Sequence, residues 1–210
     1  MNFSTRVNSI VLAGIVASAC LIATNASALT TSKFITKVVD SVQSNSSSSM
    51  PAAGTIEVAF SPNEGSEALV LKVINSAHSD IRMLAYSFTS APVVQALLNA
   101  KHRGVDIKLV VDQKNNVSED RSGKARAALS ALITAGLDVR TISVYAIHHD
   151  KVIIVDHQTV ELGSFNFSDA AAHKNSENVL VNWNNPSLAK VYANHFERNY
   201  RQSSQYQTRY

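Results

Sequence analysis

The chain has 210 residues, of which 45% are hydrophobic and 17% are charged, and its formal net charge at pH 7 is +3. These values suit one globular domain with an appendage, and the mildly basic charge permits a polyanionic partner without demonstrating one. Because Cys20 is the only cysteine, the composition excludes a fold held by intrachain disulfides, so a hydrophobic core must hold it.

The first predicted element is a secretory signal peptide over residues 1–28. Arg6 is its only charged residue, an apolar run follows from Ile10 to Ile22, and the small residues Ala26-Ser27-Ala28 have the spacing that a signal peptidase reads. The run is shorter than the roughly 20 apolar residues of a spanning helix, which favours cleavage after Ala28 over a membrane anchor. We therefore expect an exported chain, periplasmic or secreted, without a stable membrane span; lipoprotein processing at Cys20 is the alternative.

Residues 29–54 are predicted to form a flexible linker. Ser44 to Ser49 reads SNSSSS, and Met50 to Gly54 adds a proline and a glycine. Removal of the signal takes away one arginine and no acid, so the net charge falls from +3 to +2. The folded domain is expected to begin near Thr55.

Strand and helix patterns alternate from Thr55 onward. Apolar alternation predicts strands, and helical spacing predicts helices, in the order 55–60 (strand), 64–77 (helix), 80–88 (strand), 91–102 (helix), 105–112 (strand), 124–135 (helix) and 137–142 (strand). Short strands follow at 151–155, 159–162 and 178–181, and a last helix starts at Asn185-Pro186. This order predicts an α/β fold with a mixed, mostly parallel central sheet flanked by helices.

One stretch, HHDKVIIVDHQTVELGSFNFS from His148 to Ser168, groups polar side chains at the ends of two predicted strands. His149 and Lys151 lie two residues apart and point to the same side of the sheet. Ser164 and Asn166 have the same spacing after the next strand, and a short hairpin would bring the two pairs together. An imidazole, an ammonium, a hydroxyl and a carboxamide would then surround a tetrahedral phosphate, with a nucleophile in front of it.

The pattern H-x-K-x4-D-x6-G-S-x-N resembles the signature of the phospholipase D superfamily. Every fixed position is present, as His149, Lys151, Asp156, Gly163, Ser164 and Asn166. The surrounding sequence resembles most closely the small bacterial endonucleases of that superfamily. The resemblance extends from Thr55 to about Tyr200, so residues 55–205 are expected to form a phospholipase D-like catalytic domain.

The resemblance implies a role for each matching residue. His149 would attack phosphorus and form a phosphohistidine. Lys151 and Asn166 would hold the non-bridging oxygens, with Ser164 assisting in substrate binding. Glu177 would orient the histidine through its other ring nitrogen, as a third group does in hydrolytic triads. No cofactor is implied.

Two other positions of the motif, and His148 beside it, have supporting or open roles. Asp156 is expected to fix local structure rather than to touch substrate, and Gly163 supports the site in the same way. His148 either binds substrate or only packs and hydrogen-bonds. A metal site in the run His148–Asp150 is disfavoured, because strand neighbours face opposite sides and Lys151 would repel a cation.

The single copy of the motif predicts a homodimer with a shared active site. Larger members of the superfamily carry two copies, and the resemblance implies a second histidine as general acid. A two-fold dimer would place two His149 side chains face to face.

The predicted function is a phosphodiesterase, a nonspecific endonuclease acting on nucleic acid without metal, and phospholipase D activity on lipid head groups is the alternative. A module that binds phosphate without catalysis is disfavoured because no catalytic position is lost. The basic stretches Lys101–Arg103 and Arg121–Arg126 could contact a nucleic-acid backbone, or they could only be solvated.

Overall fold

The computed structural model describes residues 47–208, so the predicted signal peptide, Cys20 and most of the predicted linker lie outside the described residues. The elements, in chain order, are β1 (Thr55–Ser61), α3 (Ser66–Asn75), β2 (Asp80–Ala85), α4 (Ala91–His102), β3 (Asp106–Asp112), the π-helical turn η1 (Lys114–Ser118), α5 (Lys124–Thr134), β4 (Asp138–Ile142), β5 (Lys151–Val155), β6 (Thr159–Gly163), α6 (Asp169–His173), β7 (Glu177–Trp183), α7 (Pro186–Gln202) and β8 (Ser204–Gln205).

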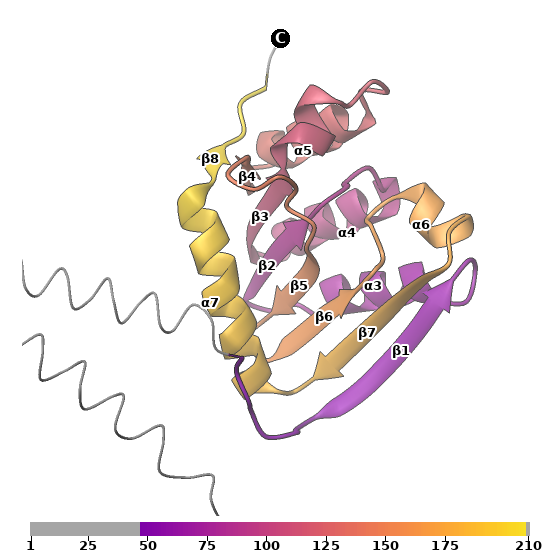
Figure 1. Ribbon diagram of the computed structural model, residues 1–210, viewed down its shortest axis with the longest axis vertical. Coiled ribbons are helices and arrows are strands. Elements are labelled where there is room, and N and C mark those ends of the chain that lie inside the picture. The colour runs from indigo at the N-terminus through magenta and orange to yellow at the C-terminus, as the bar shows by residue number, and fades with distance from the viewer. Residues whose placement is uncertain (1–46, 209–210) are drawn as a thin grey trace, which may run out of the picture. The chain divides into compact units, whose positions relative to one another are not determined.

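The described strands form one eight-stranded sheet in the order β1-β7-β6-β5-β2-β3-β4-β8, with helices on its faces (Figure 1). The predicted α/β class with a mixed sheet flanked by helices is confirmed. The prediction of a mostly parallel sheet is wrong, because only the β2–β3 and β3–β4 pairs are parallel and the other five pairs are antiparallel.

The insertion of later strands explains this difference. Strands β5, β6 and β7 lie between β1 and β2, so the α3 crossover joins two strands that point the same way but are not neighbours. Helical crossovers produce parallel neighbours only at β2-α4-β3 and at the connection from β3 through α5 to β4. As a result, β2, β3 and β6 end at the same edge of the sheet at which β5 and β7 begin.

The strands alternate their side chains between two apolar layers. In β2, Met83 and Ala85 face the layer beneath α3, α4 and α5, whereas Leu84 faces the layer beneath α7. Helix α7 buries Ala189 and Phe196 against that second layer. Figure 1 shows α7 crossing one face of the sheet and α3 and α4 covering the other face, and on the α7 side β7 and β1 have no helix in front of them.

Side-chain caps start two of the predicted helices where the sequence places them. The Ser90 hydroxyl accepts a hydrogen bond from the Val93 amide at the start of α4, and the Asn185 side chain accepts one from Leu188 at the start of α7. Among residues 47–208, no helix combines the length and the apolar character needed to cross a membrane.

Candidate active site

The motif residues gather at the sheet edge where β6 ends and where β5 and β7 begin. Lys151 is the first residue of β5 and pairs with Ala85, the last residue of β2. Gly163 is the last residue of β6, and Glu177 is the first residue of β7. The antiparallel order of β5, β6 and β7 therefore places residues that are 26 positions apart in sequence at one edge.

Lys151 lies at the centre of this edge and is only 5% exposed. Its ammonium donates a hydrogen bond of 2.7 Å to the carbonyl oxygen of His149, and it lies 5.3 Å from the centre of the Tyr86 ring. Burial lowers the pKa of Lys151, and the negative charges of Asp150 and Glu177 oppose that shift. The site thus holds a cation that is partly withdrawn from water, which strengthens its attraction for an anion.

His149 precedes β5 and is exposed. Its ring lies 4.6 Å from the Tyr86 ring, measured between centroids, and the two planes are tilted by 56°. The preceding residue is fixed by a 2.8 Å hydrogen bond from the His148 amide to the Asp112 carboxylate, which ends β3. Within the described part of the chain the imidazole makes no hydrogen bond. The backbone beside it is therefore anchored, while the ring itself is open to an incoming substrate.

Ser164 and Glu177 form a closed hydrogen-bonded unit rather than two separate groups. The Ser164 hydroxyl donates to a Glu177 carboxylate oxygen at 2.6 Å and accepts from the Asn178 amide at 3.1 Å. The second carboxylate oxygen accepts from the Asn175 side chain at 3.0 Å. No hydrogen bond among residues 47–208 joins Glu177 to His149, so in this arrangement the carboxylate holds Ser164 and its charge acts on the nearby lysine.

Asn166 lies in the loop after β6, between the fully buried Phe165 and Phe167. This loop is anchored to the loop after β2, because the Phe167 amide donates to the Ser87 carbonyl and the Thr89 amide donates to the Phe167 carbonyl. The side-chain oxygen of Asn166 is buried and has no hydrogen-bond partner within the described residues. Because a carboxamide oxygen only accepts hydrogen bonds, the part of Asn166 that could bind an anion is its N–H group.

Gly163 permits the close approach of β6 and β7. A Cβ atom at this position would lie 2.2 Å from the carbonyl oxygen of Asn178, which is backbone and cannot move aside. The same carbonyl accepts a hydrogen bond of 3.1 Å from the Ser164 amide. The glycine therefore sets the spacing that brings Ser164 within reach of Glu177.

Asp156 lies at the opposite end of β5 from Lys151, so the structure does not bring it into the site. Its carboxylate accepts hydrogen bonds from the backbone amides of His78, Ser79 and Asp80 and from the Ser79 hydroxyl. Burial opposes ionisation, but these hydrogen bonds outweigh it and lower the pKa of Asp156. The carboxylate ties the end of β5 to the start of β2.

His148 faces the interior and is 2% exposed. Its Nδ1 lies 3.6 Å from the Asp150 carboxylate, and its Nε2 is buried without a partner among the described residues. Burial lowers the pKa of His148, although Asp150 and Asp112 act in the opposite direction. Of the two roles left open by the sequence, this placement favours packing over contact with substrate.

Sequence reasoning missed three residues that shape the site. Tyr86 contacts both His149 and Lys151, and Asp112 fixes the backbone beside His149. Tyr86 follows β2 and Asp112 ends β3, and polar residues near the carboxyl ends of strands were the signal that could have identified them. The third is His195 on α7, whose Nε2 lies 2.8 Å from the Asp150 carboxylate.

The two basic stretches lie at different edges of the sheet. Lys101–Arg103 precedes β3 at the edge away from the motif, and Arg103 donates to backbone carbonyls at the end of α3. In the other stretch Arg126 also binds the protein's own backbone, because it donates to the carbonyls of Val117 and Asp120. Arg121 and Lys124 are exposed at the motif edge, so only this stretch can present charge to a substrate bound there.

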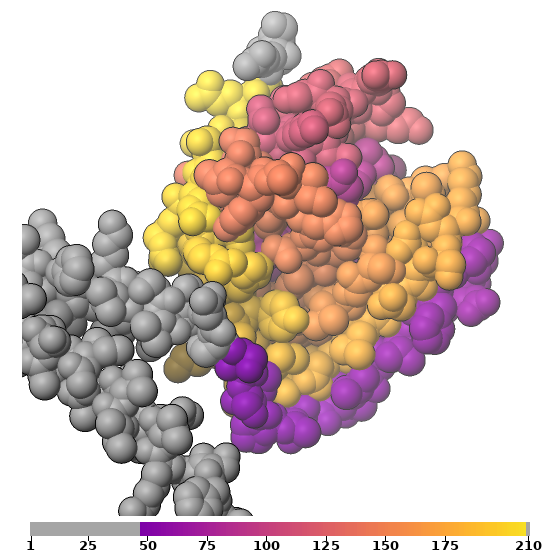
Figure 2. Space-filling view, in the orientation of Figure 1, coloured from indigo at the N-terminus to yellow at the C-terminus, as the bar shows by residue number. Residues whose placement is uncertain are grey.

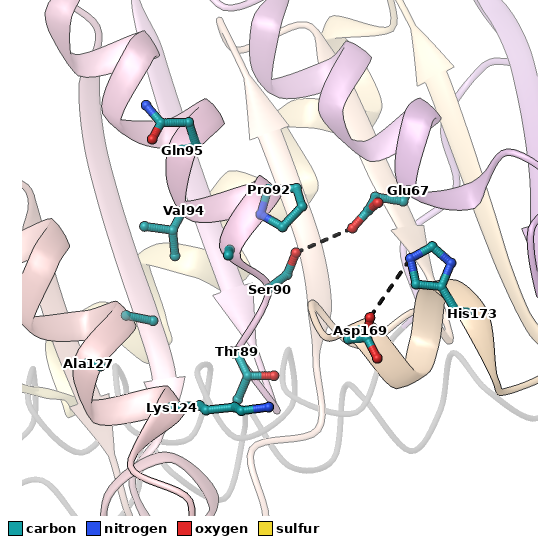
Figure 3. Close-up of a pocket in the computed structure, with 12 residues that line it drawn as sticks. Glu67, Thr89, Ser90, Pro92, Val94, Gln95, Lys124, Ala127, Asp169 and His173 are labelled. Atoms are coloured by element: carbon teal, nitrogen blue, oxygen red, sulfur yellow. Dashed lines mark hydrogen bonds and ion pairs between the residues drawn. The ribbon is translucent and has the colours of Figure 1, made fainter.

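A cleft of about 750 Å³ lies on the side of the sheet covered by α3 and α4. Figure 3 shows its polar lining, in which Ser90 contacts Glu67 at 3.5 Å and His173 faces Asp169 at 3.9 Å. None of the motif residues lines this cleft, so the candidate site is an open sheet edge. Within residues 47–208, no three His, Cys, Asp or Glu side chains are arranged to hold a metal ion.

Comparison with known proteins identifies the family. A family model described as "Cardiolipin synthase, PLD-like domain" matches residues 70–200. The phospholipase D of Rickettsia felis is 35% identical over 126 residues, which is 60% of this chain and 60% of that protein. The mitochondrial cardiolipin hydrolase of Danio rerio is 29% identical over 60% of this chain and 53% of its own length. The chain thus matches 60% and 53% of the lengths of these two curated relatives.

The crystal structure of Nuc from Salmonella typhimurium, a phospholipase D family member, superposes with a TM-score of 0.70. It is 44% identical and covers 73% of this chain and 98% of Nuc. NucT from Helicobacter pylori has the same fold, with a TM-score of 0.64 over 72% of this chain and 99% of NucT, at 21% identity. The family match over more than half of the sequence and the agreement in fold show that the chain belongs to the phospholipase D-like family, whose members hydrolyse phosphodiester bonds.

Proposed function

We propose that the protein is a phosphodiesterase that cleaves nucleic acid as a nonspecific endonuclease. The observation that carries the proposal is the exposed imidazole of His149 beside the buried ammonium of Lys151. A nucleophile and a partly desolvated cation at one point are suited to attack on a phosphate diester. The similarity to Nuc over 98% of that chain and the exposed Arg121 and Lys124 at the same edge favour nucleic acid as the substrate.

The proposed reaction has two steps and uses no metal. A nitrogen of His149 attacks phosphorus, a bond between nitrogen and phosphorus forms, and the bond to the leaving sugar oxygen breaks as an acid protonates that oxygen. Water then attacks the phosphohistidine and releases the histidine. Lys151 and the Asn166 amide bind the non-bridging oxygens, whereas Glu177 holds Ser164 and provides negative charge beside the lysine.

The acid in this scheme is proposed to be His149 of a second copy in a homodimer. The described part of the chain has one such motif, and a two-fold axis beside it would bring two histidines to one phosphate. Apolar side chains that a second copy could cover are exposed on the same side of the sheet as α7. They are Ile56, Val58 and Phe60 of β1 and Val144, Tyr145 and Ile147 of the loop before His149. Figure 2 shows this loop and β1 at the surface of that side.

The alternative substrate is a phospholipid. The named relatives that support it are phospholipases D and cardiolipin hydrolases at 26–36% identity. Purified protein should be assayed in EDTA on plasmid DNA, RNA and phosphatidylcholine vesicles. We expect cleavage of nucleic acid at an undiminished rate in the chelator, because histidine replaces a metal hydroxide as nucleophile. Cleavage of vesicles alone would favour the alternative, and activity that requires an added divalent ion would contradict the mechanism.

We also propose that residues 1–28 are a cleaved export signal. The expected mature chain starts at Leu29 and lies outside the cytoplasm, because Ala26-Ser27-Ala28 has the spacing of a cleavage site. N-terminal sequencing of protein from the periplasm or medium tests this. A chain that retains Met1 in the membrane fraction would indicate an anchor, and lipid on Cys20 would indicate a lipoprotein.

A further inference from the structure

Asp150 connects the loop that carries His149 to helix α7. It lies directly between His149 and Lys151 in sequence, and its carboxylate lies 2.8 Å from Nε2 of His195. The same carboxylate oxygen lies 3.6 Å from Nδ1 of the buried His148. Asp150, which directly follows His149, therefore connects the loop to a residue of α7 that lies 45 positions further along the chain.

Hydrogen bonding fixes the direction of this contact. Arg198 lies 2.9 Å from Nδ1 of His195, and a guanidinium can only donate. Nδ1 must then accept, so the His195 proton lies on Nε2 and is donated to Asp150. The His195 ring thus connects Arg198 of α7 to Asp150 of the loop, with its N–H group directed at Asp150.

The pair is partly shielded from water. The side chain of Asp150 is 35% exposed and that of His195 is 31% exposed. Burial raises the pKa of Asp150, but the hydrogen bond from His195 outweighs this effect and the pKa is lowered overall. Asp150 is accordingly a carboxylate at neutral pH, and it provides the negative charge that opposes the loss of the Lys151 proton.

The backbone on both sides of His149 is held from separate elements. Asp112 at the end of β3 holds the amide of His148, and Lys151 at the start of β5 holds the carbonyl of His149. Neither of these bonds restrains the loop from the α7 side. The Asp150–His195 contact supplies the restraint from α7 beside His149, and at the other end of the loop the Tyr145 hydroxyl donates to Gln202 of α7 at 2.7 Å. Restraints from different directions determine where a short loop places its side chain.

We propose that Asp150 and His195 are positioning residues that lock the loop 143–150 to α7 and so hold His149 in the orientation needed for attack. The kinetic part of this inference rests on the proposed phosphodiesterase function. The restraint itself can be measured without turnover. Loss of an ordinary exposed ion pair would change neither the hydrogen exchange of the loop nor kcat, because such pairs contribute only about 0–1 kcal/mol.

The test compares variants that remove the lock with one that preserves it. His195→Leu removes the donor, whereas His195→Gln keeps an N–H group near the position of Nε2. Asp150→Ala removes the acceptor from the other side. Backbone hydrogen exchange over residues 143–151 should become faster in His195→Leu and in Asp150→Ala and should stay close to wild type in His195→Gln, while exchange in β2 and β3 is unchanged.

Kinetics on bis(p-nitrophenyl) phosphate provides the second measurement. In His195→Leu we expect kcat to fall about 10- to 100-fold, because a misplacement of about 1 Å costs about that much. KM should stay within about two-fold, and His195→Gln should restore most of the rate. The double variant His195→Leu/Asp150→Ala should be no worse than Asp150→Ala alone, since His195 acts on the loop through Asp150.

The matched control is a second His–Asp pair at the other edge of the sheet. His157 lies 3.2 Å from Asp80, beyond the end of β5 that is opposite to Lys151. His157→Leu should change neither the exchange over 143–151 nor kcat.

Each outcome decides the inference. Unchanged exchange in both lock variants overturns it, with or without hydrolysis, and so does faster exchange with an unchanged kcat. Additive losses in the double variant, or failure of glutamine to restore the rate, also overturn it. A wild type that fails to hydrolyse the chromogenic diester would count against the proposed function, and the exchange data would still decide whether the lock exists.

Discussion

Glu161 places a carboxyl group in the interior of the sheet, where it has no exposed surface. It lies in β6 between Ile153 of β5 and Val181 of β7, both members of the layer beneath α3, α4 and α5. Neither of its oxygens has a hydrogen-bond partner within the described residues. Burial raises the pKa of Glu161 to about 8, and the backbone of Ile153 offsets only part of that shift. The folded protein therefore holds this group protonated at neutral pH.

This residue predicts a specific pH dependence of stability. The unfolded chain releases the Glu161 proton near pH 4.5 and the folded chain near pH 8, so the free energy of unfolding should fall as pH rises between these values. Glu161→Gln cannot ionise, and its stability relative to wild type should increase across that window by about 5 kcal/mol at most. Urea unfolding of both proteins at pH 5 and pH 8 measures the difference. The idea fails if the two proteins differ by the same amount at both pH values.

At the scale of elements, the sequence predicted most strands and helices because their apolar spacing is local information. It missed η1, α6 and β8, which are five residues or fewer and depend on contacts made in the folded state. It also predicted too many parallel pairs, because strand order is set by β5, β6 and β7 inserting between β1 and β2. The convergence of the motif at one edge was predictable from two-residue spacing and a hairpin. The pairing of Ser164 with Glu177 was not, because it depends on the register between β6 and β7.

The π-helical turn η1 shows how a short element supports the site. Asn116 is fully buried there, and its amide donates to the carbonyls of Tyr86 and Asp112 and accepts from the Phe88 amide. It thereby fixes the segment that carries Tyr86 against His149.

We expect Asn116→Ala to lower the free energy of unfolding by about 3 kcal/mol, because three buried backbone groups lose their partners. The rate of phosphodiester hydrolysis should also fall as Tyr86 loses its fixed position. Asn115→Ala is the matched control, since only the backbone amide of Asn115 bonds to Asp112. Urea midpoints and initial rates compare the two, and equal stability of both variants would show that η1 has no such role.

At the scale of the whole molecule, the proposed dimer makes a quantitative prediction. Wild-type subunits and His149→Ala subunits should be mixed in varying ratios and allowed to exchange. A mixed dimer retains one imidazole and lacks either nucleophile or acid, and loss of general acid catalysis costs about 10²–10⁴-fold. Activity should therefore follow the square of the wild-type fraction. A linear dependence would mean that each chain works alone with an acid of its own.

The direction of the strands has a practical consequence for attachment. The described chain enters β1 at Thr55, which pairs with Trp183 at the end of β7, on the edge away from His149. The seven residues of β1 run from that point to Ser61, and the six steps between its ends span roughly 20 Å at about 3.3 Å per residue. A solid support, fluorophore or fused protein coupled at Ala53, whose carbonyl oxygen accepts a hydrogen bond from the Asn182 side chain, would be attached beside the end of β7, not beside the motif. An immobilised form of the protein should therefore still accept long polymers at its opposite edge.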